Sequence, residues 1–327
     1  MSYLKVPEPV RELFDAFPRH KYPAIRQHTA LEKQAFEERR FSYSASSLQD
    51  GTHFTLVVYN VFQTPEQTYL ATDPLCLSAE LALALRNNNS LPKVNHDHAD
   101  KSRNAVFIAS HHAHPEGHLP LYVEEDALRK SRRITKDSVS VQETLVSRVD
   151  SSSELMLITL VDSVVYDAWM TAVLFDIDDS VKSEIYQYQQ SSEFNLVNRA
   201  GLSGLLSQLV TRNNFALRNR QIARAFDSTV SSVLVHAVLR KNDRGVEFEK
   251  QRNYREFSHA LQSIDAILSR KGTQFFSANE KPGLLDIKLA SYVTLIQKFM
   301  LGTSLLETLD EYPGLKTHAV TVVKACS

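Results

Sequence analysis

The chain has little cysteine and little glycine, and each shortage excludes a class of protein. Two cysteines among 327 residues, Cys76 and Cys326, give neither a disulfide framework nor a metal knuckle, which fits a reducing compartment. Nine glycines leave little material for turns that cradle nucleotide phosphates. With 37 basic and 38 acidic residues, the chain has no overall field that would draw it to nucleic acid or to an anionic membrane.

Long apolar runs are scarce as well, although 43% apolar content predicts a large core and the length suggests two domains. The N-terminus MSYLKVPEPVRELFDAF carries acidic residues and has no apolar centre, so we expect neither a secretory signal nor a mitochondrial presequence. Only residues 155–175 suggest a transmembrane helix. Asp162 and Asp167 would together cost about 5–7 kcal/mol on insertion, which offsets the gain from the apolar residues. The segment is therefore interpreted as a buried core helix.

Residues 1–50 form an arm that precedes the strand signals. Its segment PEPVRELFDAFP predicts a short amphipathic helix, whose apolar side needs a surface to cover, either on this chain or on a partner. We expect a second helix over residues 30–40 and a Ser-rich loop over residues 42–51. The candidate partner-binding residues of the first helix are Val10, Phe14 and Phe17.

Strand signals begin with HFTLVVYNVF, residues 53–62, which is dense in β-branched and aromatic residues. The following segment DPLCLSAELALALRNN predicts a helix, because Asp73 is a good N-cap and Pro74 suits the first helical position. A second strand is expected at residues 105–110.

A third strand is expected after Pro120, and then a short fourth strand and a helix capped by Asp137 or Ser138. A β-α-β unit followed by a β-β-α unit is the layout of a thioredoxin-like domain, in which the proline before the third strand is often cis. Residues 51–150 are therefore predicted to form such a domain.

From residue 151 to residue 327 helical signals replace strand signals, and no repeat of fixed period is present. The predicted helices cover residues 153–175, 178–190, 196–211, 217–239, 252–270, 285–301 and 304–311. The sequence thus predicts an α/β domain followed by an all-α domain.

The most specific local pattern lies near the C-terminus and resembles the helical domain of glutathione transferases. In that family a core helix opens with a capping box that ends in aspartate, and Asp286 matches it. Tyr312, Pro313 and Leu315 match the turn that introduces the next helix. Gly283 stands where the family usually has Ser or Thr, so only half of the reciprocal box is expected, with Asp286 accepting from a backbone N–H. A glutathione-transferase-like fold is the prediction.

Cys76 lies in the first turn of a predicted helix, where the helix dipole can lower the pKa of a thiol. No second cysteine is within a helix turn, and Leu75 and Leu77 flank it. Catalytic residues of this fold sit directly at the exit of the first strand, whereas Cys76 comes more than ten residues later. We therefore interpret Cys76 as a packed residue, and Asp137 and Ser138 as a helix cap rather than a glutathione site.

Histidines gather between residues 96 and 118, and two basic stretches follow. The histidines could form a zinc or copper site, but no carboxylate or cysteine spacing supports a ligand shell, and we predict a solvated loop. The stretches at 129–136 and 212–224 are either solvated faces or contacts with lipid headgroups or an acidic partner. Their candidate contact residues are Arg132, Arg133, Arg212 and Arg218.

Several segments together resemble the metaxin-type subunits of the mitochondrial sorting and assembly machinery. They occur in the family's order and are VPEPVRELFDAFP at the N-terminus, YNVF at 59–62, ATDPLCL at 71–77, LVDSVVYDAW at 160–169 and TRNNFALRNR at 211–220. The resemblance implies a transferase-like fold without transferase chemistry, and neither a cofactor nor a metal.

The same resemblance implies a location and partners. The protein would lie peripherally on the cytosolic face of the mitochondrial outer membrane, with the barrel-forming channel subunit, a second metaxin-like subunit and the lipid surface as partners. It would help receive β-barrel precursors, whose last strand carries the β-signal: a polar residue, a glycine and alternating large hydrophobics. The alternatives are a glutathione-dependent transferase or reductase that uses Cys76, and a purely structural adapter.

Overall fold

A mixed β-sheet forms the first half of the main unit of the protein. A computed structural model describes residues 29–45, 52–94, 101–114, 117–126, 133–188, 196–226, 244–277 and 281–327. Residues 40–327 form one compact unit and residues 1–39 form another. In the smaller unit, helix α2 (Ala30–Glu37) confirms the second predicted helix of the arm. Thr29 and Glu32 cap its N-terminus reciprocally, at 3.2 and 2.8 Å.

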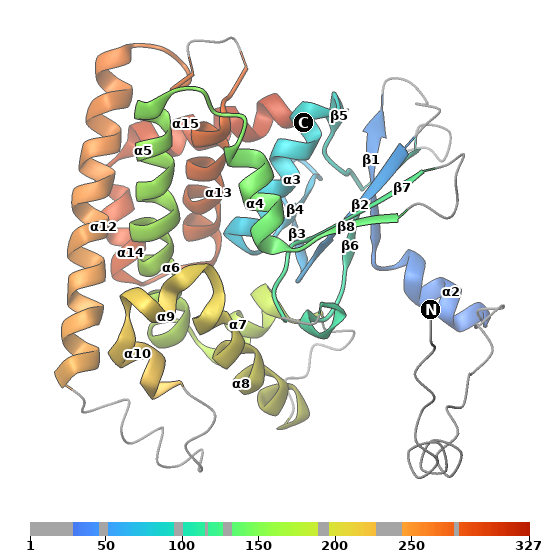
Figure 1. The fold of residues 1–327 in the computed structure, drawn as a ribbon, viewed down its shortest axis with the longest axis horizontal. Helices are drawn as coiled ribbons and strands as arrows, with labels where there is room; N and C mark the ends of the chain where they lie inside the picture. Colours follow the sequence, from blue (N-terminus) through green and yellow to red (C-terminus); the bar gives the residue numbers. More distant parts are fainter. Residues whose placement is uncertain are drawn as a thin grey trace, which may run out of the picture. The chain divides into compact units, whose positions relative to one another are not determined.

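The sheet has the strand order β5-β1-β6-β2-β7-β8 (Figure 1). Its centre is β2 (Thr52–Val58), which pairs in parallel with β6 (Lys101–Ile108) and antiparallel with β7 (Leu121–Asp126). Leu56 lies opposite Val106 on one side and Tyr122 on the other. Strand β8 (Arg133–Lys136) completes this side of the sheet.

Helices α3 (Pro74–Arg86) and α4 (Ser138–Val146) complete the predicted β-α-β and β-β-α units. Asp73 caps α3 by accepting from the backbone N–H groups of Leu75 and Cys76. The Leu119–Pro120 peptide bond is cis, at the entry of β7. The predicted thioredoxin-like element order is therefore confirmed.

Three parts of the sheet half differ from the prediction. The expected strand over 53–62 ends at Val58, and a separate hairpin of β3 (Val61–Gln63) and β4 (Tyr69–Ala71) follows. The chain turns at Asn60, because the Asn60 side chain accepts the N–H of Val61 and its carbonyl accepts that of Thr72. The prediction of a loop over 42–51 is wrong at its start, because residues 40–45 form strand β1 (Arg40–Ala45). This strand lies in the sheet between β6 and β5 (Asn89–Ser90), and its aromatic residues Phe41 and Tyr43 are two positions apart, as the strand period requires.

The helical half follows the predicted order. Its early elements are α5 (Ser152–Leu160), the π-helix η3 (Val161–Val165), α6 (Tyr166–Phe175), α7 (Asp179–Tyr186), α8 (Leu196–Thr211), the 3-10 turn η4 (Arg212–Asn214), α9 (Phe215–Arg218) and α10 (Arg220–Ala225). Its later elements are α12 (Arg244–Lys271), α13 (Leu284–Phe299), α14 (Ser304–Asp310) and α15 (Pro313–Cys326). A further 3-10 turn, η2 (His111–Ala113), belongs to the sheet half.

The predicted helix over 217–239 is broken in its described part, because α9 and α10 are separated at Asn219. The Asn219 side chain donates to the carboxylate of Asp167 and to the carbonyl of Phe215, and its backbone leaves the helical region. Residues 227–243 lie outside the described part of the chain. The amide of Asn219 is thus held in place by tertiary contacts that the local sequence does not reveal.

The helix from Ser152 to Phe175 is apolar and long enough to cross a membrane, with a mean hydropathy of 1.5 over its most apolar window. In this unit 72% of that window is buried. Trp169, fully buried, donates from its indole N–H to the hydroxyl of Tyr186 at 3.2 Å. The helix packs as the core helix that the sequence predicts. Among the described residues, only the bent pair α13 and α14, at 119°, passes the same test.

The C-terminal pattern forms the predicted half of a capping box. Asp286 accepts the N–H of Gly283 at 2.8 Å, and also the N–H of Phe276 at 2.7 Å. The imidazole of His318 on α15 lies 2.8 Å from the same carboxylate, so the box also fixes α15 against the start of α13. Helix α13 packs in turn against α3 of the sheet half (Figure 1). The boundary predicted between residues 150 and 151 stays a prediction.

Candidate functional site: a polar junction at the start of helix α3

The N-terminus of α3, the loop before β7, the π-helix with α6, and the turn after α8 meet at one buried polar cluster. We call it the polar junction, and its side chains are those of Asp73, Tyr166, Asp167, Arg212, Arg218 and Asn219. In a thioredoxin-like domain this end of the first helix and the cis-proline loop are where thiol chemistry would be placed. The junction is therefore the place to test for an active site.

Arg212 and Asp73 form the centre of the junction. Nη2 of Arg212 lies 2.6 Å from Oδ1 of Asp73, and Nη1 lies 3.1 Å from Oδ2. The guanidinium also donates to the carbonyl of Leu119 at 3.1 Å and to the hydroxyl of Tyr166 at 3.1 Å. Only 2% of the Arg212 side chain and none of the Asp73 side chain is exposed. A pair this deep is tolerable because both charges keep several hydrogen bonds after losing water.

Arg212 reaches this position because the chain bends sharply after α8. Asn213 and Asn214 both adopt left-handed backbone conformations, with φ of 52° and 57°. Asparagine enters this region more readily than most residues, so two consecutive asparagines suit the bend. The Asn213 side chain donates to the carbonyl of Asp162 at 2.6 Å, which ties the turn to the π-helix.

A second ion pair continues the junction at its outer side. Arg218 contacts the carboxylate of Asp167 with two nitrogens, at 2.9 and 2.7 Å, and Asn219 donates to the same carboxylate at 2.9 Å. Burial raises the pKa of Asp167, while the hydrogen bonds from Arg218 and Asn219 act in the opposite direction. The bidentate geometry fixes α9 against α6.

The thiol of Cys76 is not placed for nucleophilic chemistry. Cys76 is fully buried, and burial, with the nearby Asp73 carboxylate, raises the pKa of its thiol well above the ordinary value. A helix N-terminus alone would act in the other direction, so desolvation decides the balance here. Cys326 is also buried, and burial raises its pKa to about 12. Both thiols are protonated packing residues at neutral pH.

A cleft of about 630 Å³ borders the junction between α4 and the turn at Arg212. Ser138 and Gln142 line it from α4, and Asn213 and Asn214 line it from the turn. Asp137 caps α4 by accepting the N–H of Ser140 at 2.7 Å, as the cap interpretation predicts. Leu75 lines the cleft from the start of α3, whereas the fully buried Cys76 is not one of its lining residues.

The histidine tract is only partly described. His96 and His98 lie outside the described residues. His111 and His112 stack with ring centroids 3.9 Å apart, and His118 lies 3.1 Å from the carbonyl of Gln208. Within the ranges that the structure describes, no three His, Cys, Asp or Glu side chains come together in a way that could hold a metal ion.

The candidate partner-binding residues fall into four groups. Val10, Phe14, Phe17 and Arg132 lie outside the described residues. Arg133 is exposed on β8, where it pairs with Glu125. Arg212 requires a correction, because its buried guanidinium cannot contact a partner at the surface. Arg218, with 31% of its side chain exposed, is engaged by Asp167.

Sequence reasoning missed the junction because it treated the second basic stretch as a surface. One signal was available: the stretch RNNFALRNRQIAR contains no acidic residue, so its cations needed acids from elsewhere in the chain. Which acids they would find, Asp73 and Asp167, depends on tertiary packing.

Comparisons with known proteins bear directly on these segments. A family model described as SAM35, a subunit of the SAM complex, matches residues 4–124. The Sorting assembly machinery 35 kDa subunit of Saccharomyces cerevisiae is 29% identical over 318 residues, which cover 90% of each chain. This chain is a SAM35 homologue. The resemblance to subunits of the sorting and assembly machinery is thereby confirmed.

Two solved structures are similar to this SAM35 homologue. A glutathione S-transferase of Ceriporiopsis subvermispora, in complex with glutathione, is 14% identical with a TM-score of 0.41, covering 85% of this chain and 99% of that one. Ure2p in complex with glutathione is 11% identical with a TM-score of 0.30, covering 91% and 99%.

The four resemblance segments that lie within the described residues converge on the junction. Asp73 comes from ATDPLCL, Tyr166 and Asp167 from LVDSVVYDAW, and Arg212 and Arg218 from TRNNFALRNR. In YNVF, the Tyr59 hydroxyl accepts the N–H of Leu119 at 3.0 Å, beside the same guanidinium. In this SAM35 homologue these four segments therefore form one structural unit that joins the sheet half to the helical half.

Proposed function

We propose that this protein is a non-enzymatic subunit of the sorting and assembly machinery, on the cytosolic face of the mitochondrial outer membrane. It helps to receive β-barrel precursors through their β-signal and supports the barrel-forming channel subunit during insertion. The observation that carries this proposal is the 29% identity to the yeast 35 kDa subunit over 90% of both chains. A second metaxin-like subunit and the lipid surface are its further partners.

The geometry of the junction supports a binding role over thiol chemistry. A glutathione-dependent enzyme needs a reactive group that a thiol substrate can reach, whereas Cys76 is fully buried and protonated. The Arg212 guanidinium occupies the start of α3 and is held by Asp73, Leu119 and Tyr166. The fold provides a rigid body, and recognition takes place on its surface.

A crosslinking experiment tests the receptor role. A radiolabelled β-barrel precursor is imported into mitochondria that carry a tagged form of this chain, and adducts are compared for an intact and a mutated β-signal. We expect more adduct with the intact signal, and equal adducts would refute direct recognition. Cys76→Ser serves as the control variant. It should leave the adduct unchanged, and glutathione at millimolar concentration should not bind to the purified protein.

Alkaline carbonate extraction tests the location. A peripheral subunit is released into the supernatant, because its contacts are polar and its core helix is buried within the protein. Retention in the lipid pellet would contradict peripheral attachment. A structural adapter without precursor contact would be released in the same way but would give no signal-dependent adduct, so the two experiments separate the adapter from the receptor.

A further inference from the structure

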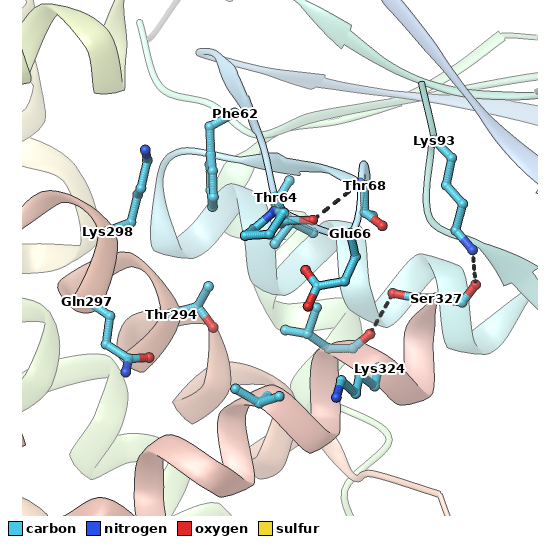
Figure 2. Close-up of a pocket in the computed structure, with 14 residues that line it drawn as sticks. Phe62, Thr64, Glu66, Thr68, Lys93, Thr294, Gln297, Lys298, Lys324 and Ser327 are labelled. Atoms are coloured by element: carbon cyan, nitrogen blue, oxygen red, sulfur yellow. Dashed lines mark hydrogen bonds between the residues drawn. The ribbon is translucent and has the colours of Figure 1, made fainter. Parts of the chain in front are cut away.

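A groove of about 500 Å³ lies between the β3–β4 hairpin and helices α13 and α15 (Figure 2). Its apolar surface comes from Phe62 and Leu70 on the hairpin and from Val320 and Val323 on α15. Val320 is 47% exposed, which is high for an aliphatic residue beside a hollow. A hollow of this size and composition can hold several large apolar side chains.

Lysines surround the groove. Lys93, Lys298 and Lys324 line it, whereas Glu66 is its only acidic lining residue among those described. Lys93 donates to the carbonyl of Ser327, and the ammonium of Lys298 lies 5.8 Å from the centroid of the Phe62 ring. Figure 2 shows Lys93 and Lys298 on opposite sides of the hairpin. With Lys93 engaged by Ser327, Lys298 and Lys324 still outnumber Glu66, and this positive charge favours an occupant that carries a carboxylate.

The hairpin beside the groove has one open edge. The edge of the hairpin on the β4 side is covered by the segment around Pro92, because the N–H of Tyr69 donates to the carbonyl of Pro92 at 2.8 Å. Strand β3 has β4 as its only partner strand in the part of the chain that the structure describes. An unpaired edge strand is a template for an incoming extended chain.

The register of the hairpin defines which backbone groups face outward. The backbone N–H of Thr64 donates to the carbonyl of Thr68, and the carbonyl of Asn60 accepts the N–H of Thr72. Since Phe62 lies opposite Leu70 in the same register, the backbone groups of even-numbered residues on the β3 side are the ones that bond to β4. The backbone N–H and C=O of Gln63 therefore point away from β4. Phe62 and Thr64 line the groove, so alternate side chains of a strand added here would face the groove as well.

We propose that this groove binds the C-terminal strand of a β-barrel precursor by strand addition to β3. Large alternating side chains enter the apolar groove. The terminal carboxylate lies near the lysine at one end of the groove, either Lys298 or Lys324, because Figure 2 shows these two lysines at opposite ends. The choice of occupant rests on the proposed function, whereas the groove, its charge and its open edge are properties of this chain. An unfolded barrel strand exposes an apolar face and unpaired backbone groups, and the groove accommodates both.

Peptide binding to the purified full-length protein tests the proposal. The probe is a fluorescent peptide with the sequence of a precursor's last strand, measured by anisotropy with a free or an amidated C-terminus. We expect one of the two variants, Lys298→Glu or Lys324→Glu, to weaken binding of the free-acid peptide about fivefold, and amidation to weaken binding to the wild type by a similar factor. Unchanged binding in both variants would contradict a carboxylate contact. Both lysines are exposed, so the substitutions leave the core intact.

Two further variants sharpen the test. Arg255→Glu on α12 is the matched control, since Arg255 is exposed outside the groove and the charge change is the same. The affinity of this variant for the peptide should stay within about twofold of the wild-type affinity. Gln63→Pro removes an N–H that does not bond to β4, so the hairpin is retained while strand addition is blocked. We expect Gln63→Pro to abolish peptide binding without a change in the circular dichroism spectrum.

The precursor crosslinking assay separates failure of the groove from failure of the proposed function. If signal-dependent adducts form equally with wild type, Lys298→Glu and Gln63→Pro, the groove proposal is wrong while the receptor role stands. If the wild type itself gives no signal-dependent adduct, the receptor role fails first. Unchanged peptide binding in the lysine variants, together with lost binding to anionic vesicles, would overturn the proposal and assign the lysines to lipid.

Discussion

Removal of the Arg212 side chain is the sharpest test of the polar junction. In Arg212→Met, the carboxylate of Asp73 stays buried and keeps the N–H groups of Leu75 and Cys76 as partners, but it loses its counter-charge. Breaking a buried ion pair by removing one member costs about 3–5 kcal/mol, because the remaining charge is uncompensated. We expect a loss of that size in the free energy of unfolding. Arg133→Met, which removes an exposed pair, is the control and should cost less than about 1 kcal/mol.

A double-mutant cycle isolates the interaction itself. Asp73→Asn retains an oxygen that can cap α3 but leaves Arg212 without its counter-charge. The double variant Asp73→Asn/Arg212→Met removes both charges, so its cost should be about 2 kcal/mol smaller than the sum of the single costs. Methionine suits the test because it fills the apolar space of the guanidinium stem without a charge.

Urea unfolding followed by circular dichroism and by Trp169 fluorescence provides the measurement. Trp169 is the only tryptophan of the chain and lies buried in the helical half, so its signal reports on that half alone. Since Arg212 and Asp73 connect the two halves, we expect the two transition midpoints to coincide in the wild type and to separate in Arg212→Met. A cost below about 1 kcal/mol, or additive single costs, would refute the assignment of the pair as the junction's centre.

Three further predictions concern other buried groups. Burial raises the pKa of Glu80 from 4.5 to about 8, so between these pH values the folded protein keeps a proton on this carboxyl that the unfolded chain releases. The free energy of unfolding should therefore fall as the pH rises from about 4.5 to about 8. Urea titrations at several pH values should show a flatter pH dependence for Glu80→Gln. The thiols of Cys76 and Cys326 should not react with Ellman's reagent until the protein is unfolded, and rapid labelling of the folded protein would contradict their burial. Asp286→Ala should lower the free energy of unfolding, measured by thermal denaturation, by about 2–4 kcal/mol, because it leaves the N–H of Phe276 and the imidazole of His318 without their acceptor. Asp310→Ala, at an exposed site, is the control and should change the same free energy by less than about 1 kcal/mol.

Local chemistry explains why so much of the element order could be predicted. Asp73 and Pro74 define the start of α3 through bonds to residues two and three positions away. Asp286 and Gly283 define the start of α13 in the same way. Such contacts are encoded within one helical turn, so their pattern can be recognised without knowledge of the fold.

Other features depended on partners far along the chain. The strand predicted over 53–62 ended early because Asn60 makes its bonds to Thr72 and to carbonyls of α7 and the residue after it. Strand β1 was missed because its serines favoured a loop, although the alternation of Phe41 and Tyr43 carries the strand period. Pairing with β6 supplied the ladder that the local sequence could not specify.

The sequence by itself determined the order of the helices and of the central strands, the caps of the main helices, and the resemblance to a family whose segments occur in the same order along this chain. Only the tertiary structure decided what those segments do. Arg212 and Asp73 are 139 positions apart, and whether a cation lies in water or in a buried pair depends on packing that brings distant segments together. A charge pattern indicates that a partner is needed, and the fold alone determines which residue provides it.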